Sequence, residues 1–165
     1  MRLLLIITLF AVLYASGCSS GQKKSRENIA VIEKYIRAVE NLDYQTMADL
    51  LDDNYYGYGP SYNDSIAKDQ AIKSWKHNTE TLYESIRYAK SRNVAVTIPS
   101  GPNKGEWVSD WGELNIEYKN GKKVTIWANT IYKINNGKIV KSYTFYNEAD
   151  VLKQLGFVFI NPEDL

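Results

Sequence analysis

The chain has 165 residues, of which 44% are hydrophobic and 13% aromatic, and its formal net charge is +1. This composition is typical of a folded domain, and the balanced charge gives no support for nucleic-acid binding, which favours a basic face. We expect one domain at residues 28–165, because no internal repeat or second linker follows residue 27.

Residues 1–17 have the pattern of a secretory signal peptide. Arg2 precedes an apolar run from Leu3 to Leu13 that is interrupted only by Thr8, and this run is too short to span a hydrocarbon core of ~30 Å. Small residues then precede Cys18, the only cysteine in the sequence. The segment resembles the lipobox of bacterial lipoproteins, which implies cleavage before Cys18 and its lipidation, with palmitate among the acyl chains. The alternative is an ordinary cysteine at the end of a secretory signal.

Residues 18–27 are short and polar, which suits a tether between a lipid and the domain. No acidic residue follows Cys18 directly. By resemblance to known sorting rules, this favours the outer membrane, facing the periplasm, over retention in the inner membrane. We therefore expect a bacterial envelope protein whose membrane partner is bound through lipidated Cys18.

Three helices are predicted before the main strands. Apolar residues recur at helical spacing between Asn28 and Glu40, and Asp43 is placed to cap a second helix. A third helix begins near Asp69 and turns Trp75 inward. His77, the only histidine, lies on the solvent side of that helix. One histidine without a cysteine partner offers too few ligands for a metal site, and we expect no metal.

The strands are marked by alternation and by turn residues. Val94–Ile98 alternates as a strand, and Tyr55–Pro60 forms a short extended piece. Its glycines would allow a helix or a ligand to pack closely, or its tyrosines, Tyr58 among them, would form a lid over the core. The region from Trp107 to Tyr146 is divided into three strands by two Asn-Gly pairs, Asn120-Gly121 and Asn136-Gly137. Asn-Gly favours two-residue type I′ hairpin turns. The Gly-containing loop before these strands lacks the spacing of a phosphate-binding loop, and no cofactor is expected.

Two-residue turns fix a register, and the register sorts the side chains onto two faces. Around the turns Leu114 would face Trp127, and Asn129 would face Thr144. The first face then carries a polar group in an apolar surface, and the helices are expected to cover it; its members include Asp110, Trp127, Asn129, Thr144 and Tyr146.

The second face is rich in aromatic residues. Three helices cover only one side of such a sheet, so this face would stay exposed beyond what a monomer normally leaves to solvent. It predicts a homodimer interface that contains Trp107, Trp111, Tyr143 and Phe145. A bulge in any of these strands would exchange the two faces along part of it.

The order of helices and strands resembles the nuclear transport factor 2-like superfamily, and the ending resembles its SnoaL-like branch. The matching residues are Asn136-Gly137-Lys138-Ile139-Val140, the aromatic strand Tyr143 to Asn147, and Gln154-Leu155-Gly156. The resemblance implies an α+β, cone-shaped fold with three N-terminal helices packed on a curved, mainly antiparallel sheet. Characterised cyclases of this branch use an aspartate with a histidine, which His77 does not match, and Asn147 stands where an aspartate is common.

Two functions fit these residues, and the first is favoured. It is a lipid-anchored domain that binds a small apolar or aromatic molecule, with a site formed by Tyr58, Trp75, Trp127, Asn129, Thr144 and Tyr146. The second is a cofactor-independent isomerase, cyclase or hydrolase in which Asp110 is the general acid/base. An interaction module that uses the aromatic outer face is a third possibility.

Overall fold

A computed structural model describes the backbone of residues 2–164 and the side chains of residues 21–163. The predicted signal peptide and the Cys18 side chain fall outside those described side chains. The helices are α1 (Arg2–Glu40), α2 (Tyr44–Leu50), α3 (Lys68–His77), a π-helical turn at Asn78–Leu82, α4 (Glu148–Gln154) and a 3-10 turn at Pro162–Asp164. The strands are β1 (Leu51–Tyr58), β2 (Ser65–Ala67), β3 (Tyr83–Ile98), β4 (Gly105–Tyr118), β5 (Lys123–Asn135) and β6 (Lys138–Tyr146).

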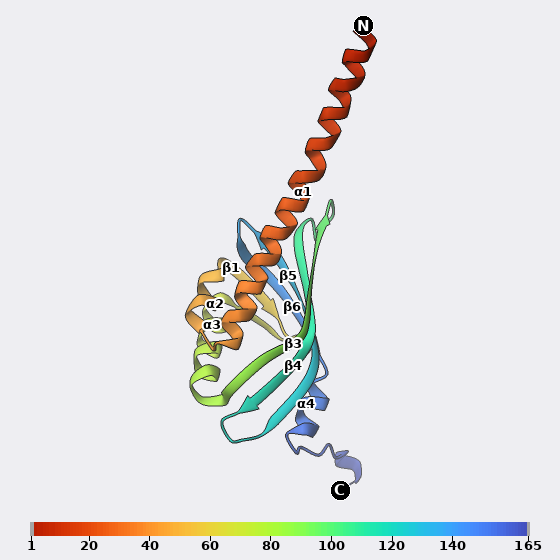
Figure 1. Cartoon of the computed structure of the whole chain (residues 1–165). Helices are drawn as coiled ribbons and strands as arrows, with labels where there is room; N and C mark the ends of the chain where they lie inside the picture. Colours follow the sequence, from red (N-terminus) through yellow and green to blue (C-terminus); the bar gives the residue numbers. More distant parts are fainter. Residues whose placement is uncertain (1, 165) are drawn as a thin grey trace.

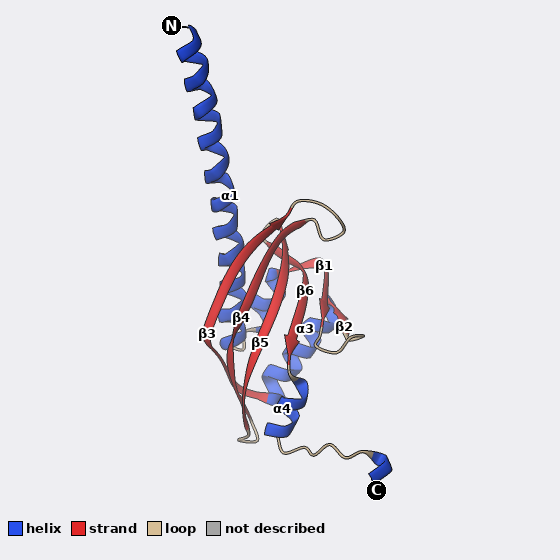
Figure 2. Cartoon of the chain, turned by 90° about the vertical axis from the view of Figure 1, so that its right-hand side faces the viewer, coloured by secondary structure: helices blue, strands red, loops and turns tan. Residues whose placement is uncertain are grey.

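The strands form one curved sheet of order β2-β1-β6-β5-β4-β3. Only the β1–β6 pair is parallel among the pairings of the described strands. Helices α1, α2 and α3 cover one face and α4 lies at the lower end, while no helix of residues 2–164 forms a layer on the opposite face (Figures 1 and 2). The predicted α+β architecture, with three helices against a curved and mainly antiparallel sheet, is confirmed.

The helical layer packs through the apolar stripe of α1. Burial begins at Asn28 and continues through Ile32, Ile36 and Val39, while side chains 21–27 are mostly exposed although their backbone is helical. The cap of α2 is as predicted, because Asp43 Oδ1 accepts a hydrogen bond of 3.0 Å from the Thr46 backbone N–H. Among the residues that the structure places, no helix is both long and apolar enough to cross a membrane.

Strand β3 is much longer than predicted. The alternation at Val94–Ile98 identified only its end, and the strand begins at Tyr83. Charged residues such as Arg87 and Lys90 obscure the pattern, since β3 is an edge strand with one face in solvent.

The two Asn-Gly pairs form different turns. At Asn136-Gly137 both residues have positive φ, 49° and 74°, as a type I′ turn requires. At the first pair only Gly121 has positive φ, 82°, and its N–H bonds to the Tyr118 carbonyl, which is the pattern of a three-residue loop with a bulge.

This difference corrects the predicted register. The extra loop residue moves β5 by one position, so Leu114 faces Ile126 rather than Trp127. A second irregularity in β6, where Val140 has no partner in β5, restores the phase, so Thr144 faces Thr130 rather than Asn129. The predicted faces of β4 and of β6 from Ser142 to Tyr146 therefore hold. Before the irregularity Ile139, not Val140, is in the core, and β5 is reversed along its length.

Candidate functional site

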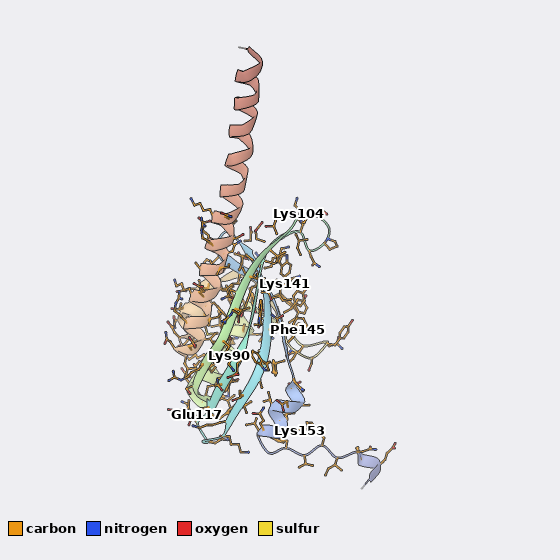
Figure 3. All side chains as sticks on the ribbon, turned by 45° about the vertical axis from the view of Figure 1, so that its right-hand side comes forward. Lys90, Lys104, Glu117, Lys141, Phe145 and Lys153 are labelled. Atoms are coloured by element: carbon orange, nitrogen blue, oxygen red, sulfur yellow. The ribbon has the colours of Figure 1, made fainter. Side chains whose placement is uncertain are left out.

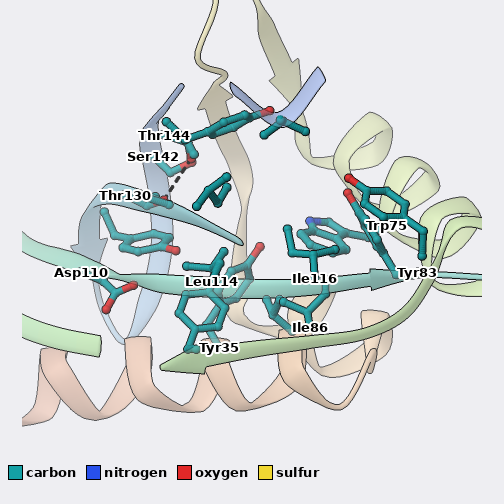
Figure 4. A pocket seen from close by; sticks show the side chains of 18 of the residues that line it. Tyr35, Trp75, Tyr83, Ile86, Asp110, Leu114, Ile116, Thr130, Ser142 and Thr144 are labelled. Carbon is teal, nitrogen blue, oxygen red and sulfur yellow. Dashed lines mark hydrogen bonds between the residues drawn. The ribbon is translucent and has the colours of Figure 1, made fainter. Parts of the chain in front are cut away.

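A cavity of about 250 Å³ lies between the helices and the concave face of the sheet (Figure 4). Its walls are mainly aromatic and aliphatic, with seven tyrosines and a few small hydroxyl groups. The lining residues are Tyr35, Val39, Tyr55, Trp75, Tyr83, Ile86, Tyr88, Asp110, Leu114, Ile116, Tyr118, Ile126, Ala128, Thr130, Tyr132, Ser142, Thr144, Tyr146 and Val151. Small-molecule sites typically combine such apolar walls with a few polar groups.

Asp110 supplies the only carboxyl group among the described residues that line this cavity. It lies at one end, and Trp75 and Tyr83 lie at the other (Figure 4). Its side chain is 3% exposed, and its Oδ1 accepts a hydrogen bond of 2.6 Å from Ser91 Oγ. Burial raises the pKa of Asp110, and the Ser91 hydrogen bond opposes part of that rise.

The backbone at Asp110 is held from the neighbouring strand. Asn129 Nδ2 donates to the Asp110 carbonyl oxygen at 2.7 Å and to Ser109 Oγ at 2.9 Å. Its amide therefore fixes the strand that carries the carboxyl group rather than contacting the cavity.

The tyrosines next to Asp110 remain protonated near neutral pH. Burial raises the pKa of Tyr88 and of Tyr132, and the nearby Asp110 charge raises both further. Burial also raises the pKa of Tyr83, at the far end, to about 12. These phenols are hydrogen-bond donors rather than anions.

Other polar groups of the cavity are paired with one another. The Tyr55 hydroxyl lies 2.7 Å from Ser142 Oγ, and the Thr130 and Thr144 hydroxyls are 3.2 Å apart. Both pairs bridge different strands and fix the positions of these hydroxyls on the wall.

Four of the residues predicted for the site are brought together. Trp75, Thr144 and Tyr146 line the same cavity as Asp110. The helical spacing of apolar residues was sufficient to place Trp75. Asp110, Thr144 and Tyr146 were placed because the faces of their strands, β4 and β6, were predicted correctly.

Three residues predicted to line the pocket lie outside it. Trp127 is 61% exposed and lies under Lys90 on the outer face, and Asn129 lies on that face too, because β5 is reversed. Tyr58 stacks on Tyr143 of the outer face, with ring centroids 4.8 Å apart, since Tyr55 is the β1 tyrosine that turns inward.

Most of the lining tyrosines were not predicted. Tyr83 and Tyr88 belong to the unrecognised half of β3, and Tyr132 was assigned to the outer face with the rest of β5. Ser142 was placed on the correct face, because alternation along β6 puts it on the same side as Thr144.

No group of three His, Cys, Asp or Glu side chains is close enough to hold a metal ion within the described residues. His77 is exposed at the end of α3, as predicted, and its Nε2 lies 3.3 Å from Thr81 Oγ1.

The outer face of the sheet carries a group of exposed apolar side chains among charged ones. Figure 3 labels Phe145 and Lys141 on the side away from α1. Trp111, Trp127 and Phe145 are 42%, 61% and 52% exposed. We call the exposed set the outer patch: Val94, Val96, Trp111, Trp127 and Phe145. A hollow beside the patch is lined by Val96, Ile98, Asn103, Trp107, Ser109, Ile131 and Tyr143.

Trp107 is on the predicted face but is 7% exposed, which corrects its assignment to an exposed surface. Lys133 Nζ lies 5.6 Å from the centroid of the Trp107 ring, and Trp107 Nε1 donates a hydrogen bond to the Asn103 carbonyl oxygen.

The cone-shaped arrangement matches many solved structures. A protein assigned as a polyketide cyclase from Xanthomonas campestris pv. campestris aligns with TM-score 0.67 and 11% identity over 80% of this chain and 98% of its own. A protein assigned as a SnoaL-like polyketide cyclase from Shewanella denitrificans OS-217 aligns with TM-score 0.60 and 14% identity over 78% and 96%. The chain has the nuclear transport factor 2-like fold.

The fold is also similar to that of an LEH-like epoxide hydrolase from M. tuberculosis, which aligns with TM-score 0.62 and 14% identity over 80% of this chain and 86% of the hydrolase. No family model and no curated protein sequence matches the chain. The resemblance found in the sequence is thus confirmed as a fold.

Proposed function

We propose that this protein is a cofactor-independent enzyme that performs acid–base chemistry on a small, largely apolar molecule enclosed in the cavity. The observation that carries the proposal is Asp110, a nearly buried carboxyl group at the end of an aromatic cavity with one neutral hydrogen-bond partner. A structural carboxylate is normally paired with a cation when it is buried. Asp110 has no ion pair within the described residues.

The surroundings of Asp110 suit proton transfer. Desolvation brings the pKa of a carboxyl group closer to neutral pH, where a general acid or base is most effective. The phenol groups of Tyr88 and Tyr132 are donors that can stabilise negative charge on a reacting oxygen. This chemistry needs only the residues of the chain.

The fold comparisons support an enzyme more than a plain binding domain. The similar structures carry the names of polyketide cyclases and an epoxide hydrolase. At 11–14% identity these names support the reaction class only by analogy.

The proposal can be tested with 5-nitrobenzisoxazole, a small aromatic probe. Abstraction of its C3 proton by a base breaks the N–O bond and gives a coloured cyanonitrophenolate. We expect the protein to accelerate this ring opening through Asp110, and equal rates with and without the protein would contradict the proposal.

A binding protein without catalysis is the second candidate. The paired hydroxyls of Tyr55–Ser142 and Thr130–Thr144 favour it, because these polar groups of the cavity wall already have hydrogen-bond partners and need no reacting group. In that case the probe would quench Trp75 fluorescence on binding and would dissociate without reacting.

We also propose that the chain is attached to the bacterial outer membrane through lipidated Cys18. The sequence before Cys18 supports this proposal. Cells producing the full chain should incorporate labelled palmitate into it, and Cys18→Ser should remove the label and release the protein from membranes. Equal labelling of the two proteins would contradict lipidation at this residue.

The outer patch supports a homodimer. Its exposed aromatic residues lie on three neighbouring strands around Asn129, which pairs with both Trp111 and Phe145, and exposed aromatic side chains are typical of association surfaces. Phe145→Lys should convert a dimer into a monomer in sedimentation velocity. A wild-type domain that sediments as a monomer at every concentration would contradict the proposal.

A further inference from the structure

The strand beside Asp110 contains a bulge. Before the bulge Ala89 pairs with Glu113, and after it Arg92 pairs with Trp111. Lys90 and Ser91 therefore lie together opposite Gly112. Lys90 has φ of 55°, which is uncommon for a residue other than glycine. Bulges of this kind redirect side chains and are frequent next to active sites.

The bulge decides which β3 side chain reaches Asp110. If the pairing of Ala89 with Glu113 continued without it, Arg92 would lie directly opposite Asp110. A guanidinium there would form an ion pair and favour the charged carboxylate. With the bulge, Arg92 lies opposite Trp111 and the uncharged Asn93 lies opposite Asp110. Ser91 Oγ reaches Asp110 Oδ1 at 2.6 Å.

Two sets of contacts fix the conformation of the bulge, one on the outer face and one with the neighbouring strand β4. On the outer face Lys90 Nζ lies 2.6 Å from Glu113 Oε2 and 5.7 Å from the Trp127 ring centroid. On the other strand, a Cβ at Gly112 would lie 3.2 Å from Ser91 Cα, so a glycine there permits the close approach of the two backbones. Separate contacts thus fix Ser91 before any ligand binds.

We propose that Ser91 is a positioning residue for the proposed acid–base chemistry: its hydroxyl holds one oxygen of Asp110 and leaves the other for the substrate. The inference rests on the proposed function of Asp110. The titratable groups facing Asp110 are Tyr88 of β3 and Tyr132 of β5, and Tyr35 of α1 packs edge-on against Tyr132. All three are neutral phenols, because burial raises their pKa values. Ser91 donates a hydrogen bond to the Asp110 carboxyl group, so its hydroxyl is the group to remove in a test.

The test is a ¹³C NMR titration of the Asp110 carboxyl carbon in the full-length protein, with the signal assigned by its loss in Asp110→Asn. Ser91→Ala removes a hydrogen bond that favours the charged form, so the titration midpoint should move to higher pH. Ser91→Thr keeps the hydroxyl and should restore the wild-type midpoint. Ser85→Ala, the same change elsewhere on β3, should have no effect.

Ring opening of 5-nitrobenzisoxazole supplies the second readout. Ser91→Ala should lower kcat roughly 10-fold at unchanged KM, because the carboxyl group loses its fixed orientation. An unchanged Asp110 midpoint in Ser91→Ala, or a shifted midpoint that Ser91→Thr fails to restore, would overturn the inference. The midpoint is measured without substrate, so this failure is distinct from failure of the proposed function, in which Asp110→Asn and wild type open the probe equally fast.

Discussion

Replacing Asp110 by asparagine should lower the rate of probe ring opening about 10²–10⁴-fold, the usual contribution of a general base. Asparagine has nearly the same shape and can still accept the Ser91 hydrogen bond, but it cannot take a proton. The measurement is kcat/KM for 5-nitrobenzisoxazole at a pH on the plateau of the pH–rate profile. Glu117→Gln is a matched control on the same strand, because Glu117 pairs with Lys123 away from the cavity, and its rate should equal that of wild type.

The same substitution separates catalysis from stability. Because burial raises the folded-state pKa of Asp110, the folded protein binds more protons than the unfolded chain between the ordinary and the raised value. The free energy of unfolding therefore falls as pH rises through that window, and the loss is fully present above it. Asp110→Asn should remove this fall, so a variant that is inactive yet at least as stable at neutral pH is expected. Loss of activity through unfolding would contradict the assignment.

Truncating Ile126 to alanine should cost about 2–5 kcal/mol of unfolding free energy, whereas Trp127→Ala should cost no more than about 1 kcal/mol. Ile126 is 7% exposed and lines the cavity, while its neighbour Trp127 is 61% exposed and contacts Lys90. Urea unfolding at concentrations where the chain is monomeric measures both changes.

This pair of variants tests the register of β5 directly. With Asn120-Gly121 as a two-residue turn, Trp127 would be inside and its loss the more damaging. A larger loss of stability in Trp127→Ala than in Ile126→Ala would contradict the three-residue loop at Gly121.

The two Asn-Gly pairs explain how much of the site could be predicted. Both were correctly recognised as hairpins, but the same dipeptide forms a two-residue turn at residue 136 and part of a three-residue loop at residue 120. The local sequence does not distinguish them, because the choice depends on which face of β5 the core accepts.

Two compensating shifts explain why Asp110 and Thr144 were placed correctly and Asn129 was not. The loop at Gly121 reverses β5, and the unpartnered Val140 reverses the phase again before Thr144. The inward tyrosines of β3 were missed for another reason. Solvent-facing charges and the Lys90 bulge interrupt the alternation by which an edge strand would be recognised.

The pH dependence of kcat/KM for 5-nitrobenzisoxazole tests the central claim, that Asp110 is a desolvated base in the cavity, most directly. The rate should rise with pH to a plateau, with its midpoint above the ordinary range of an aspartate, because the carboxylate is the active form and burial raises its pKa. Asp110→Asn should remove the inflection. A rate that does not depend on pH across this range, or an inflection that survives in Asp110→Asn, would contradict the assignment.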